Sequence, residues 1–175
     1  MLFRSAAAAE RGRLLHALFE RLPGVEAKGR MAVAERWLAH SAGVTDADAR
    51  RELITSALTV IDDPAYAALF GPDALAEAPI AGVVGGDVIA GTVDRLIVTD
   101  DAVFVVDFKT GRRVPQTPQA CPIPHLRQMG AYYALLKSIF PDHSVSAALL
   151  YTSGPVMHLL SDELIAAHKP GLVGV

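Results

Sequence analysis

Three residues suited to metal-assisted chemistry lie close together in the stretch from residue 91 to residue 111: Asp94, Asp107 and Lys109. Each carboxylate lies within an apolar segment, and turn-forming residues separate the two segments, which predicts a β-hairpin. If residues 100–101 form the loop, the two strands pair so that Asp94 lies directly opposite Asp107. Lys109 follows Asp107 by two residues, so both side chains point to the same face of their strand.

Two opposed carboxylates repel each other, and the repulsion grows when the strands are buried. A divalent cation removes this cost, because Mg²⁺ and Mn²⁺ prefer carboxylate, carbonyl and water oxygens and make a bound water more acidic. The candidate ligands are Asp94, Asp107 and the main-chain carbonyl of Phe108, with Lys109 placed to orient water or offset phosphate charge. Ordinary surface charges with Lys109 as a salt-bridge partner are the alternative. Apolar residues on both faces of both strands favour the buried, functional interpretation.

Length and composition restrict the class of protein. The chain has 175 residues, a net charge of −3 and one cysteine, Cys121, which predicts one domain over residues 1–175 with a sizeable core. A single cysteine excludes an internal disulfide framework and a cysteine-built zinc or iron–sulfur site, and it fits a reducing cytoplasm. We expect neither a membrane helix nor a signal peptide. The mild acidity gives no global electrostatic case for nucleic acid binding.

Periodicity and turn residues predict helices first, then strands, then a helix and two more strands. The expected helices cover residues 11–21, 29–40, 45–61 with Thr45 as N-cap, a short segment ending at 70, 124–139 and 162–168. The expected strands cover residues 77–84, 87–98, 102–108, 145–151 and 155–160, with a proline-rich loop over 110–124. This order predicts an α/β or α+β sheet covered by helices.

Two expected helices carry polar pairs four residues apart, a spacing that places each pair on one helix face. The pairs are His16 with Glu20 and Gln128 with Tyr132. Both have an ordinary structural alternative, namely a satisfied histidine beside an apolar stripe and a surface pair with a half-buried tyrosine.

Two further residues have roles that the sequence leaves open, and a third has an expected structural role. Arg95 could brace a neighbouring acid or meet a phosphate. Glu77 could support the metal-binding acids from the start of the first strand or be an exposed strand residue. Trp37 is expected to anchor helix packing.

Four segments, in order along the chain, resemble the motifs of PD-(D/E)XK nucleases of the RecB type. They are G-x-x-x-H-x-x-x-E over residues 12–20, G-x-x-D-R-L over 91–96, V-D-F-K-T-G over 106–111 and Q-x-x-x-Y over 128–132. The pattern is most similar to the C-terminal nuclease domain of AddA-type subunits of bacterial AddAB helicase–nucleases. The resemblance implies a restriction-endonuclease-like α/β fold with a mixed central sheet flanked by helices. It also implies Mg²⁺- or Mn²⁺-dependent exonucleolytic cleavage of DNA during double-strand break repair.

Carried over by position, the resemblance makes Asp94 and Asp107 the metal-binding acids, Lys109 the catalytic lysine and His16 an additional metal ligand. Gln128 and Tyr132 match the pair that stabilises the site and contacts the nucleic acid strand. Glu20 and Arg95, which lie within these motifs, would support these groups, with a surface position as the alternative for Glu20.

The implied partners are DNA, helicase domains in the same full-length chain and a second AddB-type subunit, with this chain a C-terminal fragment. No membrane partner, nucleotide or iron–sulfur cluster is expected in this domain. The alternative is a catalytically inactive nuclease-fold module that binds DNA or docks a subunit. The presence of both acids and the lysine argues against that alternative.

Overall fold

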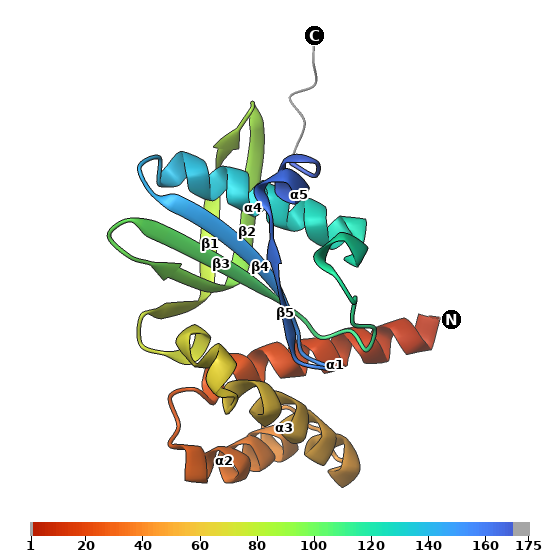
Figure 1. Cartoon of the computed structure of the whole chain (residues 1–175). Coiled ribbons are helices and arrows are strands. Elements are labelled where there is room, and N and C mark those ends of the chain that lie inside the picture. Colours follow the sequence, from red (N-terminus) through yellow and green to blue (C-terminus); the bar gives the residue numbers. More distant parts are fainter. Residues whose placement is uncertain (1, 170–175) are drawn as a thin grey trace. The chain divides into compact units, whose positions relative to one another are not determined.

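The structure is a computed structural model and describes residues 2–169 (Figure 1). The chain forms two compact units. The first contains the residues up to Pro72 and two short segments, Lys109–Arg113 and Tyr151–Pro155. The second contains the remaining described residues.

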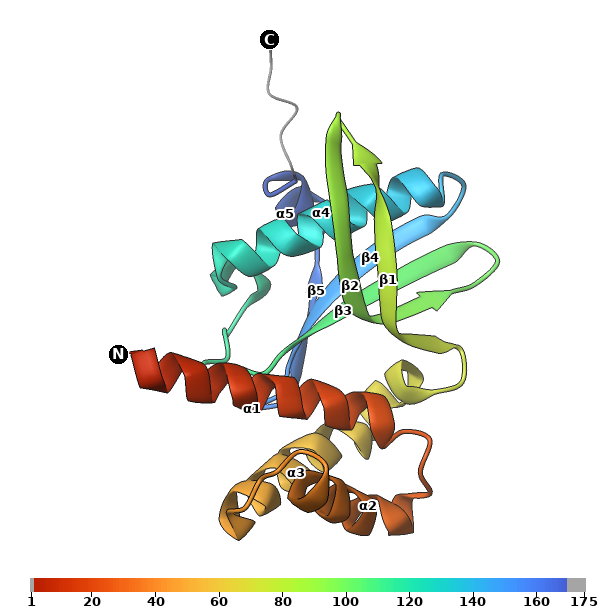
Figure 2. The same cartoon turned by 180° about the vertical axis from the view of Figure 1, so that it is seen from behind.

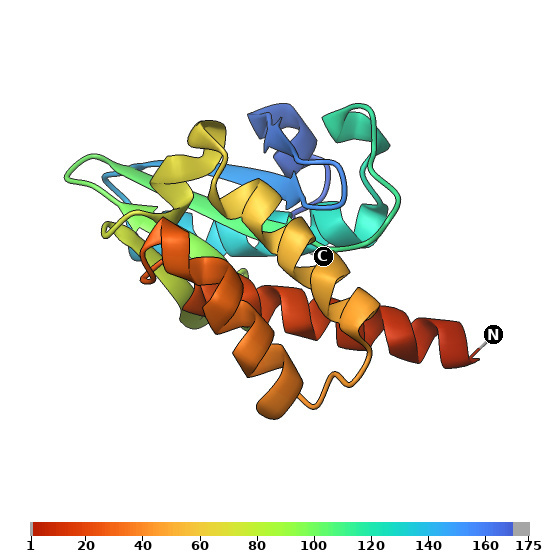
Figure 3. The ribbon, with the colours of Figure 1, turned by 90° about the horizontal axis from the view of Figure 1, so that it is seen from below.

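The first unit is helical and is built around α3 (Ala47–Ile61), which packs against both α1 (Leu2–Arg21) and α2 (Ala27–His40) (Figure 3). A 3-10 helix, η1 (Pro64–Phe70), follows and contacts α3. The buried side chains are mainly aliphatic, as expected for amphipathic helices that share one core: Leu14, Leu15, Leu18, Leu22, Ala34, Leu38, Leu53, Ala57 and Val60.

Two helix starts differ from the prediction. α1 begins at Leu2 rather than near residue 11, since the alanines at 6–9 favour helix without contributing an apolar stripe. The N-cap of α3 is Asp46, not Thr45, because the Asp46 carboxylate accepts the N–H groups of Asp48 and Ala49 at 2.8 and 3.1 Å. Both differences are local.

The second unit contains a five-stranded sheet in the order β1-β2-β3-β4-β5. The strands are β1 (Ala74–Val84), β2 (Asp87–Val98), β3 (Ala102–Lys109), β4 (Ser144–Tyr151) and β5 (Val156–Leu160). The helical elements are α4 (Ile123–Ile139), the short α5 (Asp162–Ala166) and a 3-10 turn, η2 (Pro118–Ala120), inside the proline-rich loop. The predicted elements are therefore confirmed, with shifts of a few residues at their ends apart from the earlier start of α1.

The sheet is mixed. β1, β2 and β3 form an antiparallel meander. At one end of β3 the N–H of Ser144 donates to the carbonyl of Asp101 at 2.8 Å, and at the other end the N–H of Thr152 donates to the carbonyl of Lys109 at 3.0 Å. This constant offset means that β3 and β4 run parallel, with α4 as the crossover between them. The expected α/β fold with a mixed sheet is confirmed.

α4 covers one face of this sheet and contacts β1 and β2 (Figure 2). A Cβ atom added to Gly82 of β1 would come within 2.6 Å of the Leu135 side chain of α4. Gly82 and Gly91 therefore belong to the face that α4 covers. Because strand side chains alternate between faces, Glu77 and Asp94 belong to the opposite face.

Among the described residues, no single helix has the length and apolar composition to cross a membrane, although α3 and η1, bent by 92° at their break, satisfy that criterion as a pair.

Candidate metal centre

Strand register aligns three carboxylates across β1, β2 and β3. The β1–β2 ladder pairs Ala76 with Arg95 and Ala78 with Val93, so the position between them sets Glu77 opposite Asp94. The β2–β3 ladder ends where Arg95 pairs with Val106, so the next position sets Asp94 opposite Asp107. The predicted hairpin register is thus confirmed. These three residues, the acid row, lie on the sheet face that α4 leaves uncovered.

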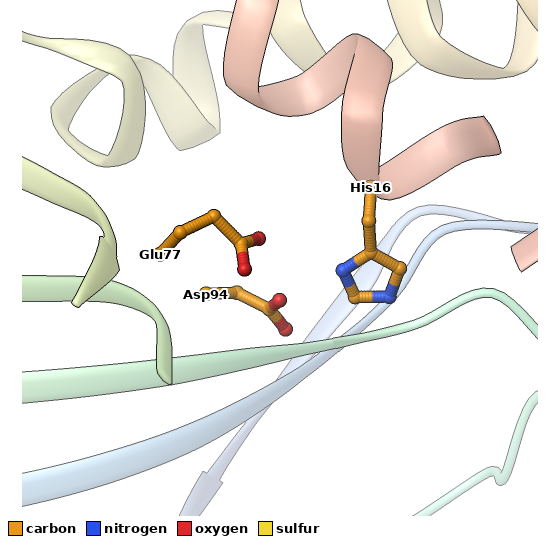
Figure 4. A group of neighbouring side chains, drawn as sticks. All are labelled: His16, Glu77 and Asp94. Atoms are coloured by element: carbon orange, nitrogen blue, oxygen red, sulfur yellow. The ribbon is translucent and has the colours of Figure 1, made fainter. Parts of the chain in front are cut away.

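Two acids of the row, Glu77 and Asp94, have their carboxylates close together. Carboxylate oxygens of Glu77 and Asp94 lie within 4.8 Å of each other, and Figure 4 shows the two side chains converging from neighbouring strands. Asp94 and Asp107 are only 7% and 5% exposed, whereas Glu77 is exposed. Two buried carboxylates at opposed positions of paired strands are unfavourable without a cation.

Glu77 has a strained backbone, with a φ of +48° in the left-handed region. A non-glycine residue in that region costs of order 1–2 kcal/mol, and such strain tends to occur at functional sites. The distortion lies in the interior of β1, at the position opposite Asp94.

The sequence leaves open whether Glu77 supports the metal-binding acids or is an exposed strand residue, although it contains a signal for the position of this residue. Gly85 and Gly86, with φ of 59° and 91°, form a two-residue loop, and Val84 pairs with Asp87. Both central residues of a type I′ hairpin turn have positive φ, which glycine adopts readily. The pairing rule that places Asp94 opposite Asp107, applied to this turn, places Glu77 opposite Asp94.

Hydrogen bonds fix the orientation of Asp94. Its Oδ2 accepts the N–H of Phe108, the residue after Asp107. Its carbonyl accepts Nη1 of Arg95 at 2.6 Å. Arg95 is 2% exposed, and its guanidinium carbon lies 5.4 Å from the centre of the Phe108 ring. Of the two roles considered for Arg95, bracing of the neighbouring acid fits this burial and this contact with the Asp94 main chain, and the role itself stays a prediction.

Lys109 is half-buried at the last position of β3, two residues after Asp107. Its carbonyl accepts the N–H of Thr152, which continues the pairing of β3 with β4 to the end of the strand. This pairing fixes the main chain from which the ammonium group projects.

α1 contacts the segment that directly follows Lys109, and this contact lies inside the first unit. Nη1 of Arg11 donates to the carbonyl of Thr110 at 2.8 Å. A Cβ atom on Gly12 would come within 2.9 Å of Oγ1 of Thr110, so this helix face requires glycine at that position. His16, half-buried and labelled in Figure 4, lies one turn after Gly12 on the same face of α1.

Arg11 is itself held by Glu52 of α3, with Nη2 of Arg11 2.7 Å from Oε1 of Glu52. Hydrogen bonding from Arg11, reinforced by its charge and by the Ser56 hydroxyl, lowers the pKa of Glu52 below its usual value, although partial burial opposes the shift. The carboxylate therefore stays ionised to a lower pH than an ordinary glutamate and holds the guanidinium in position.

Gln128 and Tyr132 support β2 from α4. The Tyr132 hydroxyl lies 3.4 Å from the carbonyl of Thr92 and 3.3 Å from Nε2 of Gln128. A Cβ atom on Gly91 would come within 2.5 Å of that hydroxyl, so glycine here lets the tyrosine approach the strand just before Asp94. Tyr132 is 8% exposed. The expected stabilising role fits this geometry, and the nucleic acid contact stays a prediction.

The donor set suits a hard cation. The acid row offers only carboxylate oxygens, the ligands that Mg²⁺ and Mn²⁺ prefer, and no thiolate lies among the acids. Glu20, expected to support the site, is exposed on the surface of α1.

Comparison with known proteins identifies the family to which this arrangement corresponds. The family model of the PD-(D/E)XK nuclease superfamily matches residues 3–163. No protein of curated function matches the sequence.

Two solved structures are similar to this chain. One is the crystal structure of a "putative exonuclease" from Eubacterium rectale, with a TM-score of 0.57 and 8% identity, over 84% of this chain and 60% of that chain. This chain therefore spans less than two thirds of that relative. The second is the crystal structure of SSO0001, with a TM-score of 0.39 and 19% identity, over 89% of this chain and 81% of that chain.

Proposed function

This chain belongs to the PD-(D/E)XK nuclease superfamily, and on that premise we propose that it is a divalent-metal-dependent deoxyribonuclease that hydrolyses phosphodiester bonds. The observation that carries the proposal is the acid row, in which Glu77, Asp94 and Asp107 occupy opposed positions on three neighbouring strands. Nothing in the stability of a sheet calls for three carboxylates in this arrangement.

We assign the metal ligands to the acid row, with His16 and the Phe108 carbonyl completing the set. The support for His16 is its place on the face of α1 whose previous turn, at Gly12, contacts Thr110 next to Lys109. An imidazole among carboxylates accepts Mn²⁺ more readily than Mg²⁺, so Mn²⁺ is the better probe of the site. A bound ion would make water more acidic and offset negative charge on the phosphate.

The chain's own residues have distinct parts in this proposal. The ammonium Nζ of Lys109 orients the attacking water and offsets charge that develops on the phosphoryl oxygens. Arg95 and the Phe108 N–H hold Asp94 in one orientation. Gln128 and Tyr132 hold the part of β2 that precedes Asp94. Such preorganised supports keep the ligands in place without rearrangement during the reaction.

We further propose that the chain acts as an exonuclease in a larger helicase–nuclease of the AddA type, which processes DNA ends in recombinational double-strand break repair in the cytoplasm. Helicase domains of the same chain and an AddB-type subunit would then deliver the DNA. The four motifs over residues 12–132 support this assignment. The net charge of −3 agrees with delivery by a partner, since the chain has no overall attraction for phosphate.

A cleavage assay tests the proposed function. The 175-residue chain is incubated with end-labelled linear DNA and Mn²⁺, Mg²⁺ or EDTA. We expect metal-dependent products from the wild type and none above background from Asp107→Ala or Lys109→Ala. Asp100→Asn, which removes a charge from the exposed loop of the same hairpin, is the matched control and should cleave normally. Undiminished cleavage by Asp107→Ala would refute the proposal.

A further inference from the structure

A groove of about 760 Å³ lies between α1 and α2, wholly inside the first unit. This volume is in the range of sites that hold small ligands or one or two residues of a polymer. Leu18, Leu22, Val33 and Ala34 supply its apolar lining, and Glu20, Arg21, Arg36, Trp37, His40 and Ser41 supply its polar and aromatic lining.

Arg21 and Arg36 differ from the other basic residues of this unit. Over residues 6–72, every other arginine and lysine forms an ion pair with a carboxylate: Arg11, Arg13, Lys28, Arg30, Arg50 and Arg51. Arg21 and Arg36 are exposed and have no carboxylate partner among the described residues, and both line the groove. The groove therefore brings together the two basic side chains of residues 6–72 that lack a carboxylate partner, and Glu20 adds one negative charge to its lining.

Trp37 lies beside this charge. Its ring is half-buried, and the guanidinium carbon of Arg21 lies 5.0 Å from the ring centre. An aromatic ring and a guanidinium plane are the two groups on which proteins stack unpaired bases, and arginine also binds the phosphates that join them. The expected role of Trp37 in helix packing accounts for its buried part and leaves its presence in a basic groove unexplained.

We propose that this groove binds single-stranded DNA, with a base packed against Trp37 and backbone phosphates held by Arg21 and Arg36. The proposal rests on the proposed nuclease function and adds a hold on the substrate that the acid row cannot provide. Charge complementarity favours a nucleic acid strand over an apolar peptide, since an apolar partner would leave both arginines unpaired.

The groove and His16 lie at neighbouring heights along α1. Glu20 and Arg21 line the groove and follow His16 by four and five residues, a rise of about 6–7.5 Å along the helix. Successive nucleotides of an extended strand are separated by a similar distance. Five residues also correspond to a rotation of about 140° around the helix, so a strand held at Arg21 would have to pass around α1 to reach His16.

Trp37 is the chain's only tryptophan, so its fluorescence reports on this groove alone. The Asp107→Asn chain, in EDTA to prevent cleavage, is titrated with a twelve-nucleotide oligothymidylate. We expect saturable quenching whose affinity decreases with salt. A plot of the logarithm of the association constant against the logarithm of salt concentration has a negative slope. Arg21→Gln/Arg36→Gln should make this slope less steep by about 1.4, or about 0.7 for each phosphate that is no longer neutralised. Arg13→Gln/Lys28→Gln, which removes two exposed basic groups outside the groove, is the matched control.

Anisotropy of a labelled oligothymidylate gives a second measurement that does not depend on tryptophan. Trp37→Leu should weaken binding by between about fivefold and 150-fold, the range for loss of one base stack. Thermal midpoints of all variants are measured to confirm folding. Absence of quenching, or equal affinity and salt slope in the Arg21→Gln/Arg36→Gln variant and the wild type, would overturn the proposal.

The two proposals fail in different ways. If the wild type binds the oligonucleotide through the groove but does not cleave DNA with Mn²⁺, the nuclease function fails and the groove assignment stands. If the Arg21→Gln/Arg36→Gln variant cleaves with an unchanged KM, the groove assignment fails and the nuclease function stands.

Discussion

In the second unit, strand register and buried hydrogen bonds hold the acid row in place, whereas in the first unit Arg21 and Arg36 extend from exposed helix surfaces. The Asp94 carboxylate accepts the main-chain N–H of Phe108, and the main-chain carbonyl of Asp94 accepts a hydrogen bond from Arg95. The two arginines have no carboxylate among the described residues to hold them. The sheet thus fixes negative charge rigidly, and the helices present positive charge on long, exposed side chains.

The difference corresponds to two requirements of cutting a polymer. Metal-assisted chemistry needs ligands held within a fraction of an ångström, which a paired sheet provides. A nuclease without sequence preference needs contacts that accept any base and many backbone conformations, which long exposed side chains and an aromatic face provide. Variants that separate chemistry from binding therefore test the comparison.

The largest expected effect is the loss of cleavage in Asp107→Asn. Removing one charge from the acid row should lower kcat by at least the order of 10²–10³-fold that follows the loss of one electrostatic group in an active site. Binding of oligonucleotide in EDTA should be unchanged, because Arg21 and Arg36 are untouched. Cleavage rates measure the expected fall in kcat, and fluorescence titrations measure the expected unchanged affinity for the oligonucleotide. If this variant lost binding and cleavage together, chemistry and binding would not be separated between the two units.

The support of β2 by α4 is tested with Gly91→Ala. The added Cβ would meet the Tyr132 hydroxyl at 2.5 Å, and overpacking of this kind costs about 1–3 kcal/mol of unfolding free energy. Denaturant unfolding measures that cost, and Tyr132→Phe in the same chain should recover part of it by removing the hydroxyl. If Gly91→Ala is as stable as the wild type, Tyr132 does not pack against β2 as described.

The strain at Glu77 is tested by comparing two substitutions that both remove its carboxylate. Glu77→Gly relaxes the φ of +48° and Glu77→Ala keeps it strained, so the glycine variant should be more stable by about 1 kcal/mol. Both should lose cleavage to a similar extent if Glu77 serves the metal site. Full activity in both would remove Glu77 from the acid row.

The smallest expected effect concerns pH and the Arg11–Glu52 pair. The pKa of folded Glu52 lies below its usual value of 4.5, mainly because Arg11 donates hydrogen bonds to it. Its contribution to stability is therefore present above about pH 4.5 and is lost as the pH falls through the lower folded value. The thermal midpoint of the wild type should decrease more than that of Glu52→Gln between about pH 5 and pH 3. Parallel decreases in both would show that the pair contributes nothing measurable.

The sequence was sufficient to predict the order of the helices and strands and to place two of the three acids of the row opposite each other. Short loops determine register, so the turn at 100–101 was enough to place Asp94 opposite Asp107. The neighbouring turn through Gly85 and Gly86 places Glu77 in the same way, but only when both hairpins are considered together.

Other features could not be predicted from pattern alone. The burial of Arg95 depends on stacking with Phe108 across the hairpin. Strand alternation places Arg95 on the face opposite Asp94 but does not reveal what covers that face. The groove depends on which arginines find carboxylate partners on neighbouring helices, and those pairings are tertiary. The four motifs contain none of Arg21, Arg36 and Trp37.

The central claim is that the acid row binds a divalent cation, and Mn²⁺ binding followed by electron paramagnetic resonance tests it most directly. The signal of free Mn²⁺ is recorded while the wild-type chain, Asp94→Asn and the control Asp100→Asn are titrated. We predict about one tightly bound ion for the wild type and for Asp100→Asn, and loss of that ion in Asp94→Asn. Equal Mn²⁺ binding by Asp94→Asn and the wild type would contradict the claim.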